Sequence, residues 1–253
     1  MGSRQKLYIL LLLTVAALAG VLAMPPIPQS ASYHDFCGAR PFAGIPNFGN
    51  VISNLPFVIV GLIGLFSVRQ SAAPRNIAVI YIFLFTGICL TGFGSAYYHL
   101  YPDNASLVFD RLPMTLVFMS LLAAIIAESI DAKTGAVALA PLLVTGIVSV
   151  LWWHYTESAG SGDLRLYVLV QYYPMILIPA VLILFPPTAG RQAWLPLVYA
   201  AVWYGMAKVF ERFDCPIYSA LGFVSGHSLK HLASAVATWL LVTRFRTLWP
   251  RKE

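Results

Sequence analysis

Eight long apolar stretches constrain the fold of this chain more than any other feature of its sequence. Each is long enough to cross the hydrocarbon core of a membrane as a helix. They lie at residues 7–24, 50–68, 76–99, 107–129, 136–155, 164–185, 193–211 and 226–243. A helix satisfies its own backbone hydrogen bonds in lipid, and the sequence lacks the alternating short strands that a barrel needs.

Composition excludes the soluble classes of protein. Of the 253 residues, 59% are hydrophobic and only 10% are charged, whereas a soluble domain carries about a quarter of its residues as charged side chains. An ordinary soluble globule, a disordered chain and a nucleic-acid binder are therefore excluded. The connecting segments are short and rich in turn residues, and no internal repeat is present, so we expect a single transmembrane domain.

The predicted fold class is an all-α integral membrane protein. We expect a seven-helix transmembrane bundle over residues 25–253, preceded by one extra transmembrane helix or a signal peptide over residues 1–24. Two bases, an apolar run and Val21-Leu22-Ala23 are also typical of a signal peptide. We favour a retained helix, and both alternatives leave the remaining topology unchanged.

Lysines and arginines predict the orientation, because they concentrate in cytoplasmic loops. With the N-terminus inside and eight spans, the cytoplasmic side receives Arg4, Lys6, Arg69, Arg75, Lys133, Arg191, Arg244, Arg246, Arg251 and Lys252. The other side receives most of the acids, namely Asp35, Asp103, Asp110, Glu157, Asp163, Glu211 and Asp214. Both termini are then cytoplasmic, and this bias rather than an anionic partner accounts for the net charge of +6.

The three cysteines fit this topology. Cys89 lies inside a span and is expected to pack there, whereas Cys37 and Cys215 fall in outer loops, where disulfides persist. A Cys37–Cys215 bond would tie the first outer loop to the loop before the last helix. The distance between their Cα atoms decides whether it forms.

All five histidines map to the outer loops or to the outer ends of spans. His227 and His231 share a face at the start of the last helix, one turn apart. His99 ends the third span, with Ser95 one turn before it, and Asp110 opens the next helix after a short turn. These five residues therefore lie at a similar depth, near the outer boundary of the bilayer.

Taken singly, each of these residues has an ordinary explanation: a histidine at the interface, or an aspartate that caps a helix. Together they indicate a site, since ionisable groups inside a membrane bundle are costly and usually functional. Three neutral imidazoles with a fourth position open to water are typical of catalytic zinc. A serine nucleophile with His99 as its base lacks the G-x-S-x-G context, and haem ligation leaves Ser95 and Asp110 without a role.

The pattern of these residues resembles the alkaline ceramidase family of membrane amidases, in the wider superfamily of the adiponectin and progestin receptors. That family has S-x-x-x-H at the end of one core helix, an aspartate eleven residues after the histidine, and H-x-x-x-H in the seventh. The resemblance extends to Asp35-Phe36-Cys37, Asn50-Val51-Ile52-Ser53-Asn54-Leu55 and Phe213-Asp214-Cys215. It covers the chain from about Asp35 to the C-terminus.

The resemblance implies a role for each site residue. His99, His227 and His231 would hold zinc, Asp110 would activate the water, and Ser95 would stabilise the oxyanion. The substrate would be ceramide or a related lipid amide that enters from the bilayer and is cut into a fatty acid and an amine-bearing lipid. The competing classes are a non-enzymatic receptor or transporter with structural zinc, and a structural bundle whose polar cluster is a hydrogen-bond network.

The sequence departs from the family pattern at several positions. Gly38, Arg40 and Asn47 stand where the family's other calcium ligands lie after Asp35, so we do not expect calcium dependence. Arg111 and Lys230 are predicted to place positive charge near the metal. This charge would lower the zinc affinity or bind an anionic headgroup. Alternatively, the two side chains extend away to the membrane interface.

Some polar residues receive no part in the site. His34 and His154 are expected to face the outer interface, and Glu128 the inner one. Lys208 and Glu211 are expected to pair on one helix face, since they are three residues apart.

Overall fold

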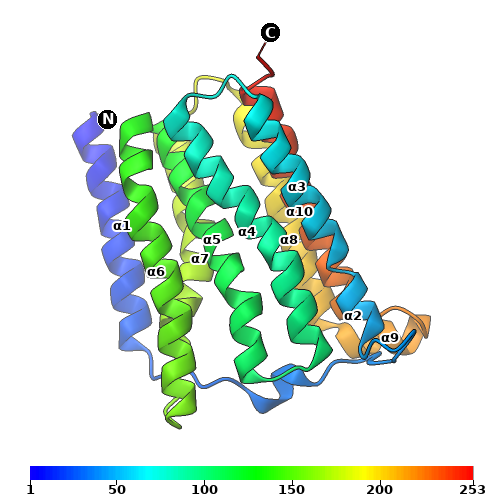
Figure 1. Ribbon diagram of the computed structural model, residues 1–253. Coiled ribbons are helices and arrows are strands. Elements are labelled where there is room, and N and C mark those ends of the chain that lie inside the picture. Colours follow the sequence, from blue (N-terminus) through cyan, green and yellow to red (C-terminus); the bar gives the residue numbers. More distant parts are fainter. Residues whose placement is uncertain (253) are drawn as a thin grey trace. The chain divides into compact units, whose positions relative to one another are not determined.

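The structure is a computed structural model that describes residues 1–252, and the regular elements within that range are helices (Figure 1). In chain order they are α1 (Ser3–Ala23), the 3₁₀ helix η1 (Ala31–His34), α2 (Phe48–Ile52), α3 (Leu55–Gln70), α4 (Arg75–Leu100), α5 (Asn104–Ser129), α6 (Ala132–Ser158), α7 (Arg165–Leu184), α8 (Arg191–Arg212), α9 (Asp214–Leu221) and α10 (Gly226–Leu248). Each predicted span is helical, which confirms the all-α fold class.

The second predicted span, 50–68, is not one continuous helix. It is divided into α2 and α3, and the break falls at Ser53 and Asn54. Both side chains turn back to the same backbone group: Ser53 Oγ and Asn54 Nδ2 donate to the carbonyl oxygen of Asn50, at 3.1 and 2.7 Å. Pro56 occupies the first turn of α3, where its missing N–H costs nothing.

Seven helices of the described chain are long and apolar enough to cross a membrane, so this is a multi-pass membrane protein. They are α1, the α2–α3 pair, α4, α5, α6, α7 and α8. The predicted eighth span, 226–243, lies within α10, which has 23 residues but is not among the seven. Its polar side chains lower its hydropathy, and several of them, including His227, His231 and Arg244, are buried.

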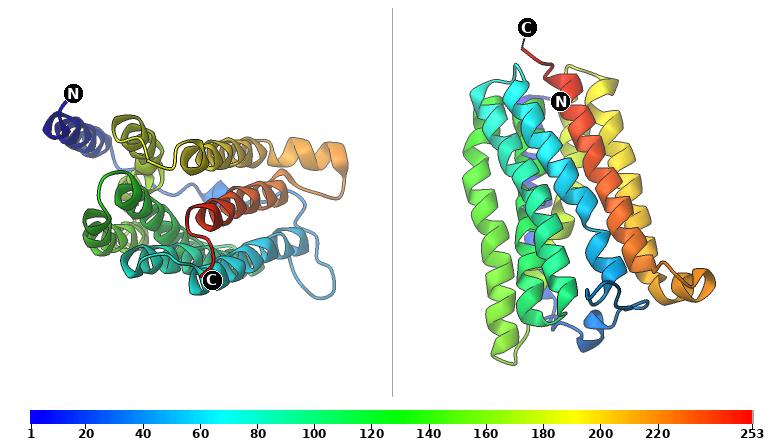
Figure 2. Two further views of the ribbon diagram at one scale, coloured as in Figure 1. Left: turned by 90° about the horizontal axis from the view of Figure 1, so that it is seen from above. Right: turned by 45° about the vertical axis from the view of Figure 1, so that its right-hand side comes forward.

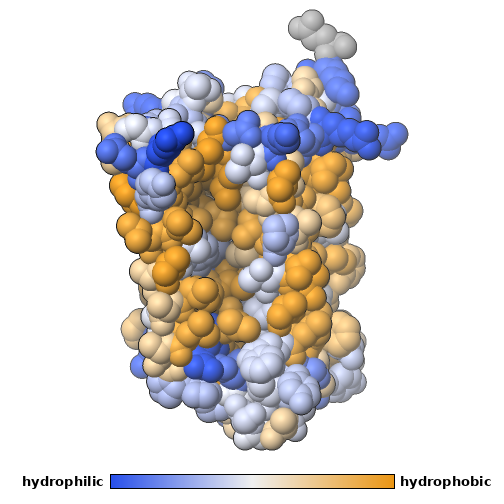
Figure 3. All heavy atoms as spheres, turned by 90° about the vertical axis from the view of Figure 1, so that its left-hand side faces the viewer, coloured by the Kyte–Doolittle hydropathy of each residue, from blue (hydrophilic) through white to orange (hydrophobic). Residues whose placement is uncertain are grey.

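The chain divides into two compact units. Unit 1 comprises Met1–Gln29, Pro74–Leu84 and Thr115–Gly190. In it α7 packs against both α1 and α6, and the hydroxyl groups of Thr14 and Tyr173 lie 2.5 Å apart. On the face that carries α1, apolar side chains cover the middle and hydrophilic ones gather at both ends, as a membrane-crossing surface requires (Figure 3).

Asp163, between α6 and α7, holds Arg165 in place within unit 1. The Arg165 side chain donates to both Asp163 carboxylate oxygens, and its Nη1 donates to the Leu22 and Met24 carbonyls near the end of α1. The hydrogen bond from Arg165 lowers the pKa of Asp163 from 3.8 to about 2. The ion pair therefore stabilises the fold above the unfolded pKa, and its contribution disappears as the pH falls from about 4 through 2.

We expect Asp163→Asn to remove about 1–2 kcal/mol of stability at pH 6 and almost none at pH 2. The measurement is the thermal midpoint of the purified protein and the variant across this range. Comparison of the two proteins cancels the titration of every other carboxylate. A difference in midpoint that stays constant from pH 6 to pH 2 would contradict this assignment.

Unit 2 comprises Ser30–Ala73, Phe85–Met114 and the C-terminal segment from Arg191. Within it α10 lies between α8 and α3 and packs against both, as the view from above shows (Figure 2). Gly61 and Gly64 of α3 allow close approach to α4, since a Cβ on either glycine would collide with Cys89 or Phe85. All of the predicted site residues belong to unit 2.

Candidate metal centre

Three histidines converge in unit 2. His99 lies in the last turn of α4, and His227 and His231 lie in the first two turns of α10. All three are buried, and one ligand nitrogen from each lies within 4.8 Å of the others. Their ring centroids are 4.8–5.0 Å apart, so the structure brings the predicted triad together.

The cluster has the properties that a metal site needs. Tetrahedral zinc with Zn–N bonds of about 2.0–2.1 Å places neighbouring ligand nitrogens about 3.3 Å apart, and Nε2 of His99 lies 3.2 Å from Nε2 of His227. Nε2 of His231 is buried without a hydrogen-bond partner, an arrangement that is costly unless another group binds there. The donor set and the orphaned nitrogen therefore fit a divalent metal ion.

Ser95 and Asp110 lie in this region on facing turns of α4 and α5. Both are buried, and the Ser95 hydroxyl is close enough to donate a hydrogen bond to the Asp110 carboxylate. Gly94 makes this approach possible, because a Cβ there would collide with the carbonyl oxygen of Phe109. Ser95 directly follows Gly94 in the sequence, and Asp110 directly follows Phe109. The close contact between Gly94 and Phe109 therefore brings Ser95 and Asp110 near each other.

Asp110 is not the cap of α5, which was one explanation of its position in the sequence. The helix begins at Asn104, and Asp103 accepts a hydrogen bond from the Ser106 backbone N–H at 2.6 Å, as a capping residue does. Asp110 follows almost two turns later, inside the helix. Its burial therefore has no explanation in helix capping.

The two basic residues beside the site have partners. Lys230 Nζ lies 3.0 Å from Glu211 Oε1, and the other oxygen of Glu211 lies 2.8 Å from Lys208 Nζ, which confirms the predicted Lys208–Glu211 pair. Arg111 lies over the ring of Tyr33, with 5.5 Å between its guanidinium carbon and the ring centroid. Glu211 thus offsets part of the positive charge that Lys230 brings toward Asp110.

Phe36 was not predicted to touch the histidines. Its ring packs edge-on against His99 and His227, with centroid distances of 4.6 and 4.4 Å. The next residue, Cys37, forms the disulfide with Cys215, and their Cα atoms are 5.1 Å apart. The segment between η1 and α2 therefore covers one side of the histidine cluster.

Backbone groups of the histidines are held by residues that sequence reasoning also missed. Asp214 accepts from the N–H groups of His227 and Cys37, at 2.7 and 3.0 Å, and Asn47 Nδ2 donates to the His99 carbonyl at 3.0 Å. The sequence signal for Asp214 was its place in Phe213-Asp214-Cys215, one of the motifs that carried the resemblance, whereas Asn47 was noted only as a departure from the family's calcium ligands. The contacts explain why these motifs accompany the histidines.

The remaining histidines lie outside the cluster. His34 is hydrogen-bonded through its two nitrogens to Tyr98 Oη and Asn104 Oδ1, at 2.8 and 3.0 Å. His154 lies in α6, which belongs to unit 1. Cys37, Asp214 and Cys215 also lie close together, but the disulfide consumes both thiolates that a metal would need.

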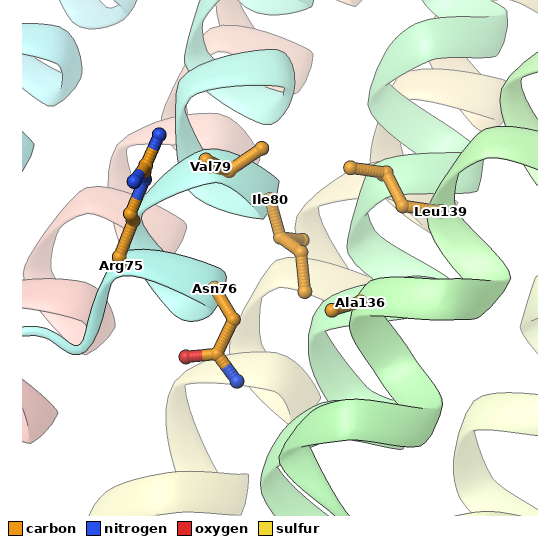
Figure 4. A pocket seen from close by; sticks show the side chains of 6 residues that line it. All are labelled: Arg75, Asn76, Val79, Ile80, Ala136 and Leu139. Carbon is orange, nitrogen blue, oxygen red and sulfur yellow. The ribbon is translucent and has the colours of Figure 1, made fainter.

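A cleft of about 480 Å³ lies in unit 1, between the first turns of α4 and α6 (Figure 4). It is lined by Arg75, Asn76, Val79, Ile80, Ala136 and Leu139. None of these side chains is a general base or a metal ligand of the predicted set. Among the described residues, the candidate metal ligands therefore lie at the histidine cluster of unit 2 and not in this cleft.

Comparison with known proteins points to the same part of the chain. No curated protein matches the chain. The family model named Ceramidase matches residues 29–249, which includes the whole histidine cluster, Ser95 and Asp110 and covers most of the sequence. The chain therefore belongs to the ceramidase family.

Proposed function

We propose that this protein is a zinc-dependent intramembrane amidase that hydrolyses the N-acyl bond of ceramide or a related lipid amide. The observation that carries this proposal is the buried cluster of His99, His227 and His231 in a chain of the ceramidase family. The family name points to ceramide as the substrate and to hydrolysis of an amide bond. The products are a fatty acid and an amine-bearing lipid.

The three histidines would hold the metal through one nitrogen each. Bound zinc would supply Lewis acidity, which polarises the amide carbonyl and brings the pKa of water to about 7. The fit rests on the spacing of the Nε2 atoms of His99 and His227 and on the unpartnered Nε2 of His231. Neutral imidazoles also suit zinc better than calcium or magnesium, which prefer oxygen ligands.

Asp110 and Ser95 have complementary roles in this proposal. The Asp110 carboxylate accepts a proton from the attacking water and returns it to the leaving nitrogen, so that the amide becomes a carboxylic acid and an amine. With substrate bound, the Ser95 hydroxyl turns its single proton from Asp110 to the carbonyl oxygen as negative charge develops on that oxygen. Lys230 and Arg111 add positive charge near Asp110, where the reaction develops negative charge.

The proposed position of the site suits a lipid amide. His99 ends α4 and His227 begins α10, so the cluster lies where helices end rather than at their middle. Acyl chains can then remain in the hydrocarbon while water reaches the amide. The distribution of bases and acids supports an orientation with both termini cytoplasmic and the site on the outer side.

The test is release of fatty acid from ceramide by the purified full-length chain in lipid vesicles. We expect release to stop after treatment with a zinc chelator and to return when zinc is added back, because the metal supplies the Lewis acid. The product is measured by mass spectrometry, with ceramide vesicles that lack protein as the control.

Two outcomes would contradict this proposal. Failure to release fatty acid from ceramide and from other N-acyl lipids would favour a receptor or transporter. Release that continues in demetallated protein would remove the metal from the reaction.

A further inference from the structure

The motif Asn50-Val51-Ile52-Ser53-Asn54-Leu55 has no part in the proposed reaction, yet it lies against the metal centre. It forms the end of α2, the break and the start of α3. Asn50 and Ser53 are polar, and they are 2% and 7% exposed. Buried polar groups are retained at such positions when each has a defined partner.

The hydrogen bonds of Ser53 suit one tautomer of His231. Ser53 Oγ lies 2.7 Å from His231 Nδ1 and donates its single proton to the Asn50 carbonyl at 3.1 Å. Because Asn50 offers an acceptor for the hydroxyl proton, the geometry suits the tautomer in which His231 Nδ1 carries a proton and donates it to Ser53 Oγ. Nε2 then has a free lone pair, which is the form of imidazole that binds a metal, and this Nε2 is the buried nitrogen without a partner.

Asn50 extends this contact to the beginning of α10. Its Oδ1 accepts from Ser228 Oγ at 2.8 Å and from Ser225 Oγ at 3.3 Å. Ser225 is the N-cap of α10 and accepts from the Ser228 backbone N–H at 3.0 Å. The motif thus contacts the helix at the cap before His227 and again at His231, one turn after His227.

We propose that Ser53 is a positioning residue of the metal centre, which holds His231 in the Nδ1-protonated form with Nε2 directed at the ion. This inference rests on the metal site of the proposed function. Partners of this kind orient metal-binding histidines, and their loss weakens metal affinity by about 10–100-fold. Asn50 assists by accepting from the two serines at the start of α10.

The experiment compares Ser53→Ala, Ser53→Thr and Ser67→Ala in the full-length protein. Ser67 is a matched control, because it is also 7% exposed and also donates to a backbone carbonyl, that of Ile63, at 2.7 Å. It lies in α3 and touches none of the three histidines. The measurements are the zinc dissociation constant, by competition with a chelator, and the visible spectrum of the cobalt-substituted protein.

We expect Ser53→Ala to weaken zinc binding by about 10–100-fold and to change the cobalt spectrum. Ser53→Thr keeps the hydroxyl and should restore both, and Ser67→Ala should match the wild type. Unchanged zinc affinity and cobalt spectrum in Ser53→Ala would overturn the inference. Loss of folded protein in Ser53→Ala alone would also overturn it, because the residue would then serve the fold.

These readouts separate the inference from the proposed function. Weaker zinc binding in Ser53→Ala, in a protein that hydrolyses no lipid amide, would support the role of Ser53 and refute the reaction. Amide hydrolysis with unchanged zinc affinity in Ser53→Ala would do the reverse. A wild-type protein that binds neither zinc nor cobalt would overturn both.

Discussion

Asp110→Asn is expected to lower the rate of amide hydrolysis by about 10²–10⁴-fold while leaving bound zinc unchanged. The amide of asparagine occupies the same space as the carboxylate, but it accepts no proton from water. Asp110 is not part of the group of side chains that would hold the metal, which is His99, His227 and His231, so the metal should remain. The measurements are the turnover of a ceramide substrate and the zinc content of the same sample.

Asp103→Asn is the control for this change. Asp103 stands at the start of the same helix and accepts from the Ser106 N–H, and asparagine caps a helix equally well. We expect this variant to hydrolyse ceramide at the wild-type rate. Equal turnover by Asp110→Asn and the wild type would exclude Asp110 from the mechanism, whatever the control showed.

His227→Ala should abolish both zinc binding and hydrolysis. Two histidines remain after this change, and a catalytic zinc site needs three protein ligands besides water. Zinc content should therefore fall from about one ion per chain to nearly none. Metal analysis of the purified protein measures this directly and does not depend on knowing the substrate.

The matched control removes a histidine that lies outside the cluster. His154→Ala should leave zinc content and hydrolysis at their wild-type values, because His154 belongs to α6 in unit 1. A His227→Ala protein that keeps a full complement of zinc would show that the metal binds elsewhere. Retention of zinc with loss of hydrolysis would instead assign His227 a role other than ligation.

The helices could be predicted from the sequence because lipid imposes one solution on every apolar stretch of sufficient length. Helix α10 is the exception: it is helical as predicted, but it is not among the helices apolar enough to cross a membrane. The polar side chains of α10 lower its hydropathy, but His227, His231 and Arg244 are buried against other helices rather than exposed to lipid. Hydropathy measures composition and cannot distinguish a polar side chain that faces the core from one that faces outward.

The histidines could be brought together from the sequence because helix geometry and common depth suffice to place them. Four-residue spacing puts His227 and His231 on one face, and the end of α4 brings His99 to the same level. Ser53 and Phe36 could not be found in this way. They reach the cluster through the break between α2 and α3 and through a loop tied by a disulfide, which no periodicity describes.

The electrostatic surroundings were predicted least well. The sequence places Lys230 next to His231 and thereby suggests an uncompensated charge beside the metal. In the structure Glu211, nineteen residues earlier in the chain, accepts from Lys230 at 3.0 Å. Such a pair depends on how α8 packs against α10, and the sequence spacing of the two residues does not reveal it.

The cross-link between Cys37 and Cys215 has a practical consequence for producing this protein. Asp214, beside one cysteine, holds the His227 backbone, and Phe36, beside the other, lies on two imidazole rings. Glutathione and thioredoxin keep cysteine pairs reduced in the cytosol. Folding in a host whose export machinery oxidises thiols should therefore yield better-formed metal centres than refolding under reducing conditions.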